Sequence, residues 1–366
     1  MDFEPCGPGC MRASIVFPPA EWLAAPALSV DGYTGHMLLR GGAIDVTPEE
    51  AGRPNVTALF DLTGNALLGG TIVLPPAEDV VCHPYFFPGD VRGFRIPNLE
   101  HSGHPSQELL GSLHAAGWSW HPPWIAASAG APLDLCEPFT DGGDPAHLLF
   151  GCGRSLKLIR QPGSSEIEAP FPDLQGLIIS GKGSAGTAVM VELLPGVQFQ
   201  LHTYDREHGL RPFGDPAPGW PCEVGIGDRY VALVTGDVIE RTAACDTYVQ
   251  DPVIQVFDRT TGQQRSFSAG PGPDATGTII QTFGDYVVAF IDGETLNALV
   301  ILRVSDGQIR RIEPHEGYAF HADSVGVDGS YFWFVESLVG GSQDYYGRWL
   351  YRYDLARFEE LGPTFP

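Results

Sequence analysis

A short pattern recurs five times along the chain, and it restricts the possible folds more than any other feature. In each copy an aromatic or aliphatic segment ends at an Asp or Ser, a short turn usually containing Gly follows, and a segment with alternating polar residues comes next. The anchor residues are Asp61, Asp205, Asp258, Ser305 and Asp354. Asp accepts hydrogen bonds from its own turn and Gly adopts positive φ, so each copy predicts a β-hairpin.

The spacing of these anchors indicates a repeat of about 48 residues. The last four anchors are 53, 47 and 49 residues apart, and the first gap, of 144 residues, is three times 48. Turn-like segments at 98–104 and 160–165 lie near the two missing positions. A second strand-like segment follows Gly227, Gly284 and Gly329, so each repeat is expected to hold four antiparallel strands. The sequence therefore predicts an all-β fold with seven repeats.

The turns at Phe60–Gly64 and Phe257–Gly262, with their Asp and Thr-Gly, resemble the blades of β-propellers of the WD40-like and quinoprotein-like group. The resemblance covers roughly residues 28–366 and implies a single domain, a seven-bladed β-propeller with four antiparallel strands per blade. Residues 1–27 form an N-terminal segment in which Arg12–Phe17 could close the ring. The regular Trp of quinoprotein repeats and a Trp-Asp blade ending are missing, so neither a quinone cofactor nor the WD40 family proper is supported. Two β-sandwiches remain an alternative.

Charge excludes several kinds of partner. The chain has 45 Asp and Glu against 21 Lys and Arg, a net charge of -24. Nucleic acids and anionic membranes are bound through Lys and Arg, so both are poor partners for this chain. The chain contains no run of about 18 apolar residues, so the sequence predicts no membrane-spanning helix. Only Lys157 and Lys182 are lysines, which is typical of a GC-rich genome, and we expect a bacterial source.

The cysteines favour an oxidising compartment. Six of the seven form pairs close in sequence, and Cys82 is left over; the pairs are Cys6 with Cys10, Cys136 with Cys152, and Cys222 with Cys245. We interpret these pairs as disulfides of a secreted, periplasmic or cell-surface protein whose signal peptide is absent from this chain. Scattered buried thiols of a cytosolic protein are the alternative.

Four segments between second and third strands are expected to be long, mostly acidic loops on one face of the ring. They are Arg40–Asn55, Thr235–Pro252, Asp292–Asn297 and Glu336–Arg348. The candidate ligand-binding residues are Glu223, Asp237, Asp246, Asp292, Glu294, Asp344, Tyr345 and Tyr346. Such a rim would suit Ca²⁺, another divalent cation or a basic partner, with the tyrosines as contact residues. The alternative is that these carboxylates are only solvated loop residues.

A second set of polar residues is predicted to line the central channel. His83, His321 and Asp323 are candidate metal ligands, and Glu223 occupies a comparable position. An imidazole and carboxylates around a divalent ion could activate water; more often such groups satisfy one another. No convincing nucleophile motif is present, so no catalytic residue is assigned.

These observations lead to three functional hypotheses. The first is an exported, monomeric binding or scaffold module, without enzymatic activity, that uses its acidic loop face to bind a protein or small-molecule ligand. The second is a metal-assisted hydrolase or lactonase-like enzyme that works at the channel. The third is a carbohydrate-binding propeller, for which Trp118, Trp120 and Trp124 supply aromatic surfaces.

Overall fold

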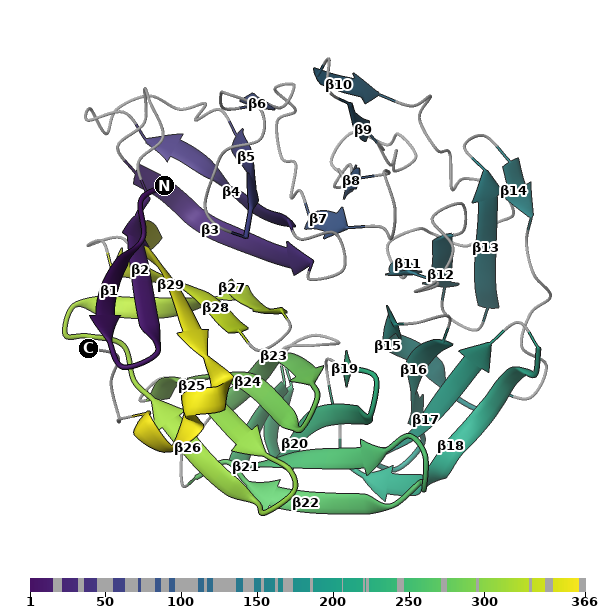
Figure 1. Ribbon diagram of the computed structural model, residues 1–366. Helices are drawn as coiled ribbons and strands as arrows, with labels where there is room; N and C mark the ends of the chain where they lie inside the picture. The colour runs from purple at the N-terminus through teal and green to yellow at the C-terminus, as the bar shows by residue number, and fades with distance from the viewer. Residues whose placement is uncertain are drawn as a thin grey trace.

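Short β-strands and tight turns make up almost all of the computed structural model. It describes residues 1–15, 22–31, 36–44, 55–62, 72–73, 83–86, 92–95, 111–114, 117–120, 136–140, 148–152, 155–161, 164–166, 174–184, 187–205, 207–219, 221, 224–241, 247–270, 275–293, 296–328, 331–339 and 345–361. The strands form antiparallel sheets that follow one another around a ring (Figure 1).

Three successive sheets show the repeat most clearly. The first consists of β15 (Leu177–Ser184), β16 (Thr187–Leu194), β17 (Gln198–Asp205) and β18 (Gly209–Pro218). The second consists of β19 (Val224–Ile226), β20 (Tyr230–Arg241), β21 (Thr247–Asp258) and β22 (Gln264–Ser268). The third consists of β23 (Ala275–Phe283), β24 (Tyr286–Gly293), β25 (Leu296–Arg303) and β26 (Gln308–Ile312). Each strand pairs antiparallel with the next, so four strands per sheet is confirmed for these repeats.

The first part of the chain contributes further sheets. One consists of β3 (Trp22–Asp31), β4 (His36–Ile44), β5 (Asn55–Asp61) and β6 (Ile72–Val73). Two strand pairs follow, β7 (His83–Phe86) with β8 (Arg92–Arg95) and β9 (Gly111–His114) with β10 (Gly117–Trp120). Another four-stranded sheet consists of β11 (Cys136–Thr140), β12 (Leu148–Cys152), β13 (Ser155–Gln161) and β14 (Ser164–Glu166).

The two ends of the chain meet in one sheet. It consists of β27 (Tyr318–Asp328), β28 (Tyr331–Val339) and β29 (Tyr345–Asp354), and the N-terminal strands β2 (Cys10–Ser14) and β1 (Glu4–Gly7) complete it. Cys10 pairs with Tyr353 and Ser14 with Trp349, and β2 begins two residues before the segment Arg12–Phe17 that was expected to close the ring. Backbone pairing of β2 with β29 therefore joins the N-terminal segment to the last strand.

The predicted hairpin turns owe their shape to the anchor carboxylates. The Asp258 side chain accepts hydrogen bonds from the backbone N–H groups of Thr260 and Thr261, at 2.9 and 3.0 Å. Asp205 and Asp354 also accept from the residue two positions on. The choice of Ser305 as an anchor is wrong. Gly307 donates to the carbonyl of Arg303 as Gly262 does to that of Asp258, so Arg303 holds the anchor position and pairs with the carboxylate of Asp306.

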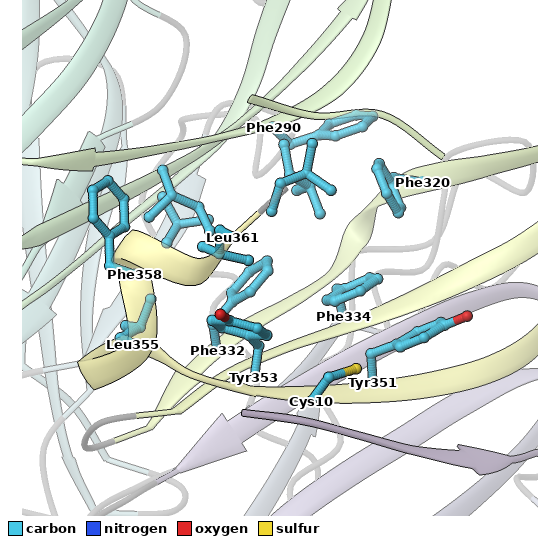
Figure 2. Close-up of a cluster of buried hydrophobic side chains, with 14 residues drawn as sticks. Cys10, Phe290, Phe320, Phe332, Phe334, Tyr351, Tyr353, Leu355, Phe358 and Leu361 are labelled. Carbon is cyan, nitrogen blue, oxygen red and sulfur yellow. The ribbon is translucent and has the colours of Figure 1, made fainter. Parts of the chain in front are cut away.

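An apolar cluster rich in aromatic residues lies between the last two sheets of the ring. It joins aromatic residues of β27, β28 and β29 to aliphatic residues of β24 and β25 and to the 3₁₀ helix η2 (Leu355–Glu360). Figure 2 shows these side chains; the rings of Phe334 and Tyr351 stack with centroids 4.7 Å apart. Phe358 of η2 is fully buried in the same cluster. The end of the chain is therefore fixed to the preceding sheet by core packing.

Candidate functional site

The ring has two faces that differ in their connections. On one face, here called the connection face, second strands run into third strands, as in the β20–β21 and β28–β29 hairpins. On the other, the turn face, third strands end at the anchor turns. Linkers between sheets also enter on the connection face, since Tyr318 at the start of β27 pairs with Leu338 near the end of β28.

The prediction that Thr235–Pro252 is a loop is wrong. β20 continues to Arg241 and β21 begins at Thr247, which makes a long hairpin. Asp237 is therefore a strand residue paired with Gln250. The predicted loop residues Asp292, Tyr345 and Tyr346 also lie in strands: Asp292 is in β24, and the two tyrosines are in β29. The reason for the error is the same in each hairpin. Polar residues alternate along the strand where it reaches the end of the sheet, and a prediction from composition alone assigns such a segment to a loop.

Both long hairpins leave their own sheet at a bulge. In the β20–β21 ladder the register shifts between Thr235 and Asp237, opposite Asp251, whose φ is +50°. In the β28–β29 ladder it shifts between Glu336 and Ser337. Bulges bend a strand and increase its twist. Beyond them, β21 pairs with β23 and β29 pairs with β3, so each hairpin leans onto the next sheet around the ring.

The β20–β21 hairpin and a segment of the turn face differ in charge. The hairpin segment from Asp237 to Asp251 contains four carboxylates and one arginine. On the turn face, the segment from Arg303 to Arg311 contains three arginines and one carboxylate. There Arg303 binds Asp306 and Glu359, and Arg310 lies 3.3 Å from Glu359. The arginines of this turn-face segment are therefore paired with nearby carboxylates, whereas carboxylates outnumber arginines in the sequence of the hairpin segment.

A buried carboxylate organises the connection face beside the β28–β29 hairpin. Glu336, only 2% exposed, accepts a hydrogen bond at Oε1 from the backbone N–H of His315, at 2.9 Å. The ring Nδ1 of His315 lies 2.7 Å from the same oxygen. The Tyr351 hydroxyl donates to Oε2 at 3.1 Å. In a neutral imidazole, a carboxylate so placed favours the tautomer with its proton on Nδ1, and Nε2 of the half-exposed His315 is then the acceptor nitrogen.

Two further groups tie this cluster to the N-terminal strands. Arg12 of β2 pairs in register with Tyr351, hydrogen-bonds it, and binds Glu4 at 2.9 Å. Burial, followed by the negative charge of Glu336, raises the pKa of Tyr351 well above its usual range. Tyr351 therefore keeps its proton and remains a donor to Glu336 under all ordinary conditions.

A second buried carboxylate occupies the equivalent position in the β15–β18 sheet. Glu192 pairs with Gln200, which lies five residues before the anchor Asp205. In the same way, Glu336 pairs with Trp349, which lies five residues before the anchor Asp354. Glu192 Oε1 accepts from the backbone N–H of Gly176, and Oε2 lies 2.6 Å from Nε2 of His202. Gly176 and His315 both precede a first strand. In both sheets the Glu therefore fixes the incoming linker.

Sequence reasoning missed these groups for a definite reason. Glu336 was expected to be the first residue of a solvated loop, and the structure buries it in β28 instead. Glu336 directly follows the apolar run Phe332–Val335, and the sequence alone does not show whether the strand continues through it. His315 gave no local signal, because its partner is 21 residues away.

The predicted metal ligands are only partly placed. His83 begins β7, paired with Arg95, and His321 and Asp323 lie in β27, where the register shifts between Phe320 and Val325. Glu223, Asp246, Glu294 and Asp344 lie outside the described residues. Among the side chains that the structure describes, no three His, Cys, Asp or Glu are grouped to hold a metal ion. Trp118 and Trp120 lie in β10, and Trp124 lies outside the described residues.

The cysteine pairs stand as follows. Cys6 and Cys10 form a disulfide across the β1–β2 hairpin. Cys136 and Cys152 are directly opposite each other in the β11–β12 ladder. Cys82, Cys222 and Cys245 lie outside the described residues. The part of the chain that the structure describes contains no helix long and apolar enough to span a membrane.

Comparison with solved structures defines the fold. The β-propeller domain of the Trilobed protease from Pyrococcus furiosus, described as having an open velcro topology, matches 91% of this chain and 96% of its own, with a TM-score of 0.56 and 13% identity. U3-55K matches 94% of this chain and 98% of its own, with a TM-score of 0.56 and 10% identity. A chain of the COPII outer coat vertex matches 89% of this chain and 83% of its own, with a TM-score of 0.54 and 10% identity.

These matches, together with the antiparallel four-stranded sheets arranged in a ring, show that the chain is a divergent β-propeller. At 10 to 13% identity the likeness concerns the fold alone. Neither a protein-family model nor a curated protein sequence matches the chain.

Proposed function

We propose that this propeller is an exported binding or scaffold module that binds a basic partner on its connection face. The single observation that carries the proposal is the β20–β21 hairpin. It leaves its sheet at a bulge, leans onto the next sheet, and carries three carboxylates, Asp237, Glu240 and Asp251, with Arg241 in its two strands. Aligned negative charge on one face attracts and orients a cationic partner.

The finer architecture belongs to the same proposal. We take the ring to have seven blades, in a single domain closed by the N-terminal strands, with β7–β8 and β9–β10 together forming one blade because β8 lies beside β9. Export is supported by two features of the cysteines. The Cys6–Cys10 disulfide is closed, and the register of Cys136 opposite Cys152 gives a Cα separation that suits a disulfide. A monomer is the simplest state in which the connection face stays free.

The test compares neutralised variants of the two faces. Asp237→Asn, Glu240→Gln and Asp251→Asn are combined in one chain. The matched control combines Glu207→Gln, Asp228→Asn and Glu360→Gln, exposed carboxylates away from the connection face, and changes the net charge equally. Binding is measured to a panel of synthetic Arg- and Lys-containing peptides and to the same peptides with Gln in place of Arg and Lys. We expect the first variant alone to lose about tenfold or more in affinity for the basic peptides that bind.

A metal-assisted hydrolase is the second candidate, favoured by one observation. In β27 the segment from His321 to Ser324 interrupts the ladder between Phe320 and Val325. Such irregularities are over-represented next to active sites, and this one contains both His321 and Asp323. Stoichiometric Ca²⁺, Zn²⁺ or Mn²⁺ in the purified protein, lost in a His321→Ala and Asp323→Ala variant, would support it; metal-free protein that gains no thermal stability on metal addition contradicts it.

A further inference from the structure

A continuous chain of polar contacts crosses the last sheet from its outer edge to the connection face. It starts in the N-terminal clasp, defined as residues 4–14 with strands β1 and β2. Glu4 binds Arg12, Arg12 hydrogen-bonds Tyr351, and Tyr351 donates to Glu336. Glu336 in turn holds the backbone N–H and the ring of His315. The contacts thus connect four β-strands, β1, β2, β29 and β28, and the linker before β27.

The clasp is a short hairpin that extends the last sheet at its β29 edge. The Cys6–Cys10 disulfide closes its hairpin, and Cys10 is buried in the apolar cluster. The carbonyl of Gly9 accepts a hydrogen bond from the backbone N–H of Asp354, at 3.0 Å. The Arg12 guanidinium lies over the ring of Trp349, 4.8 Å from its centroid. Docking therefore places the Arg12 cation next to Tyr351.

We propose that docking of the N-terminal clasp sets the orientation of His315 on the connection face. A buried carboxylate is stable only while its oxygens accept hydrogen bonds and a cation lies near. Glu336 accepts from His315 and Tyr351, and Arg12 is the cation that reaches Tyr351. When the clasp undocks, the charge of Glu336 loses this support and its hold on His315 weakens. The inference rests on the proposed function only in treating this face as the binding face.

The experiment measures His315 directly and needs no partner. Its readouts are hydrogen exchange of the segment 313–318 and the rate of carbethoxylation of His315 by diethylpyrocarbonate, both by mass spectrometry. His208 is the internal reference. Its Nδ1 lies 2.8 Å from Asp205 Oδ1, the same kind of pair, but it lies on the turn face. Binding to the basic peptides is recorded separately, so loss of peptide binding and loss of coupling are distinguishable.

Three variants break the chain at different points. Arg12→Met keeps an unbranched stem over Trp349 but removes the donors. Tyr351→Phe keeps the ring stacked on Phe334 but removes the hydroxyl. Cys6→Ser with Cys10→Ser opens the staple of the clasp. Each should raise the exchange of segment 313–318 by about tenfold or more and speed His315 modification, with His208 unchanged, because a charge-assisted hydrogen-bond network is lost. Glu4→Gln, which leaves the Arg12 contact to Tyr351, is the matched control and should change little.

Non-additivity provides the decisive comparison. In the Tyr351→Phe background, Arg12→Met should add almost nothing at His315, because the chain of contacts is already broken. Full additivity of the two substitutions overturns the proposal. An unchanged His315 in a variant whose clasp residues 4–14 exchange freely overturns it as well.

Discussion

Truncation of the Phe358 side chain should destabilise the packing of η2 against the last two sheets. Phe358 is fully buried in the cluster between the last two sheets, and its ring lies 5.7 Å from that of Tyr286. The Arg303 and Arg310 guanidinium groups lie over it at 4.9 and 5.4 Å. Removing a buried Phe side chain costs about 3 to 5 kcal/mol, and each lost cation–π contact about 0.5 to 1 kcal/mol.

We therefore expect Phe358→Ala to lower the free energy of unfolding by about 4 to 7 kcal/mol. For a chain of 366 residues that unfolds as one unit, this corresponds to a fall in Tm of about 5 to 9 °C. Urea unfolding followed by tryptophan fluorescence measures the loss, and Phe358→Leu, which retains most of the apolar volume, is the control. A loss below about 1 kcal/mol for Phe358→Ala would refute the conclusion that η2 is part of the core.

Three further predictions concern other parts of the ring. Gly176→Ala should destabilise the protein by at least about 2 kcal/mol, because a Cβ there would lie 1.5 Å from the carbonyl oxygen of Leu193; unchanged urea unfolding contradicts that contact. Asp258→Ala should cost about 1 kcal/mol by removing two turn hydrogen bonds, while Asp215→Ala at an exposed position should be neutral. Burial raises the pKa of Tyr353 to about 12, above the value of about 10 in an unfolded chain. The unfolded chain therefore loses this proton at lower pH, and the free energy of unfolding should fall between about pH 10 and pH 12. Equal stability at about pH 9.5 and pH 11.5, with Tyr353→Phe as control, would contradict this.

The fold could be predicted from the sequence because each repeat is marked by interactions between residues close together in the chain. At Asp258 the carboxylate and Gly262 act within five residues, so the turn can be recognised without knowing its surroundings. The anchor was wrongly assigned to Ser305 because Arg303 occupies the position of the anchor Asp in this repeat, and the nearby carboxylate belongs to Asp306. The extents of the hairpins were missed because pairing of Val249 with Ala275 depends on the neighbouring sheet.

The candidate site was less accessible to sequence reasoning. Glu336 and His315 are far apart in sequence, and only the burial of Glu336 makes their contact significant. Arg12 reaches the same cluster from the opposite end of the chain, through ring closure. Contacts of this kind depend on tertiary packing, which a pattern of polar and apolar residues does not specify.

The connection face is tested most directly by one comparison of affinities. The measurement is the affinity of the chain with Asp237→Asn, Glu240→Gln and Asp251→Asn for the basic peptides, relative to the chain with Glu207→Gln, Asp228→Asn and Glu360→Gln. We predict a loss of about tenfold or more in the first chain and near-normal binding in the second. Equal losses in both chains would show that only net charge matters and would contradict a binding role for this face.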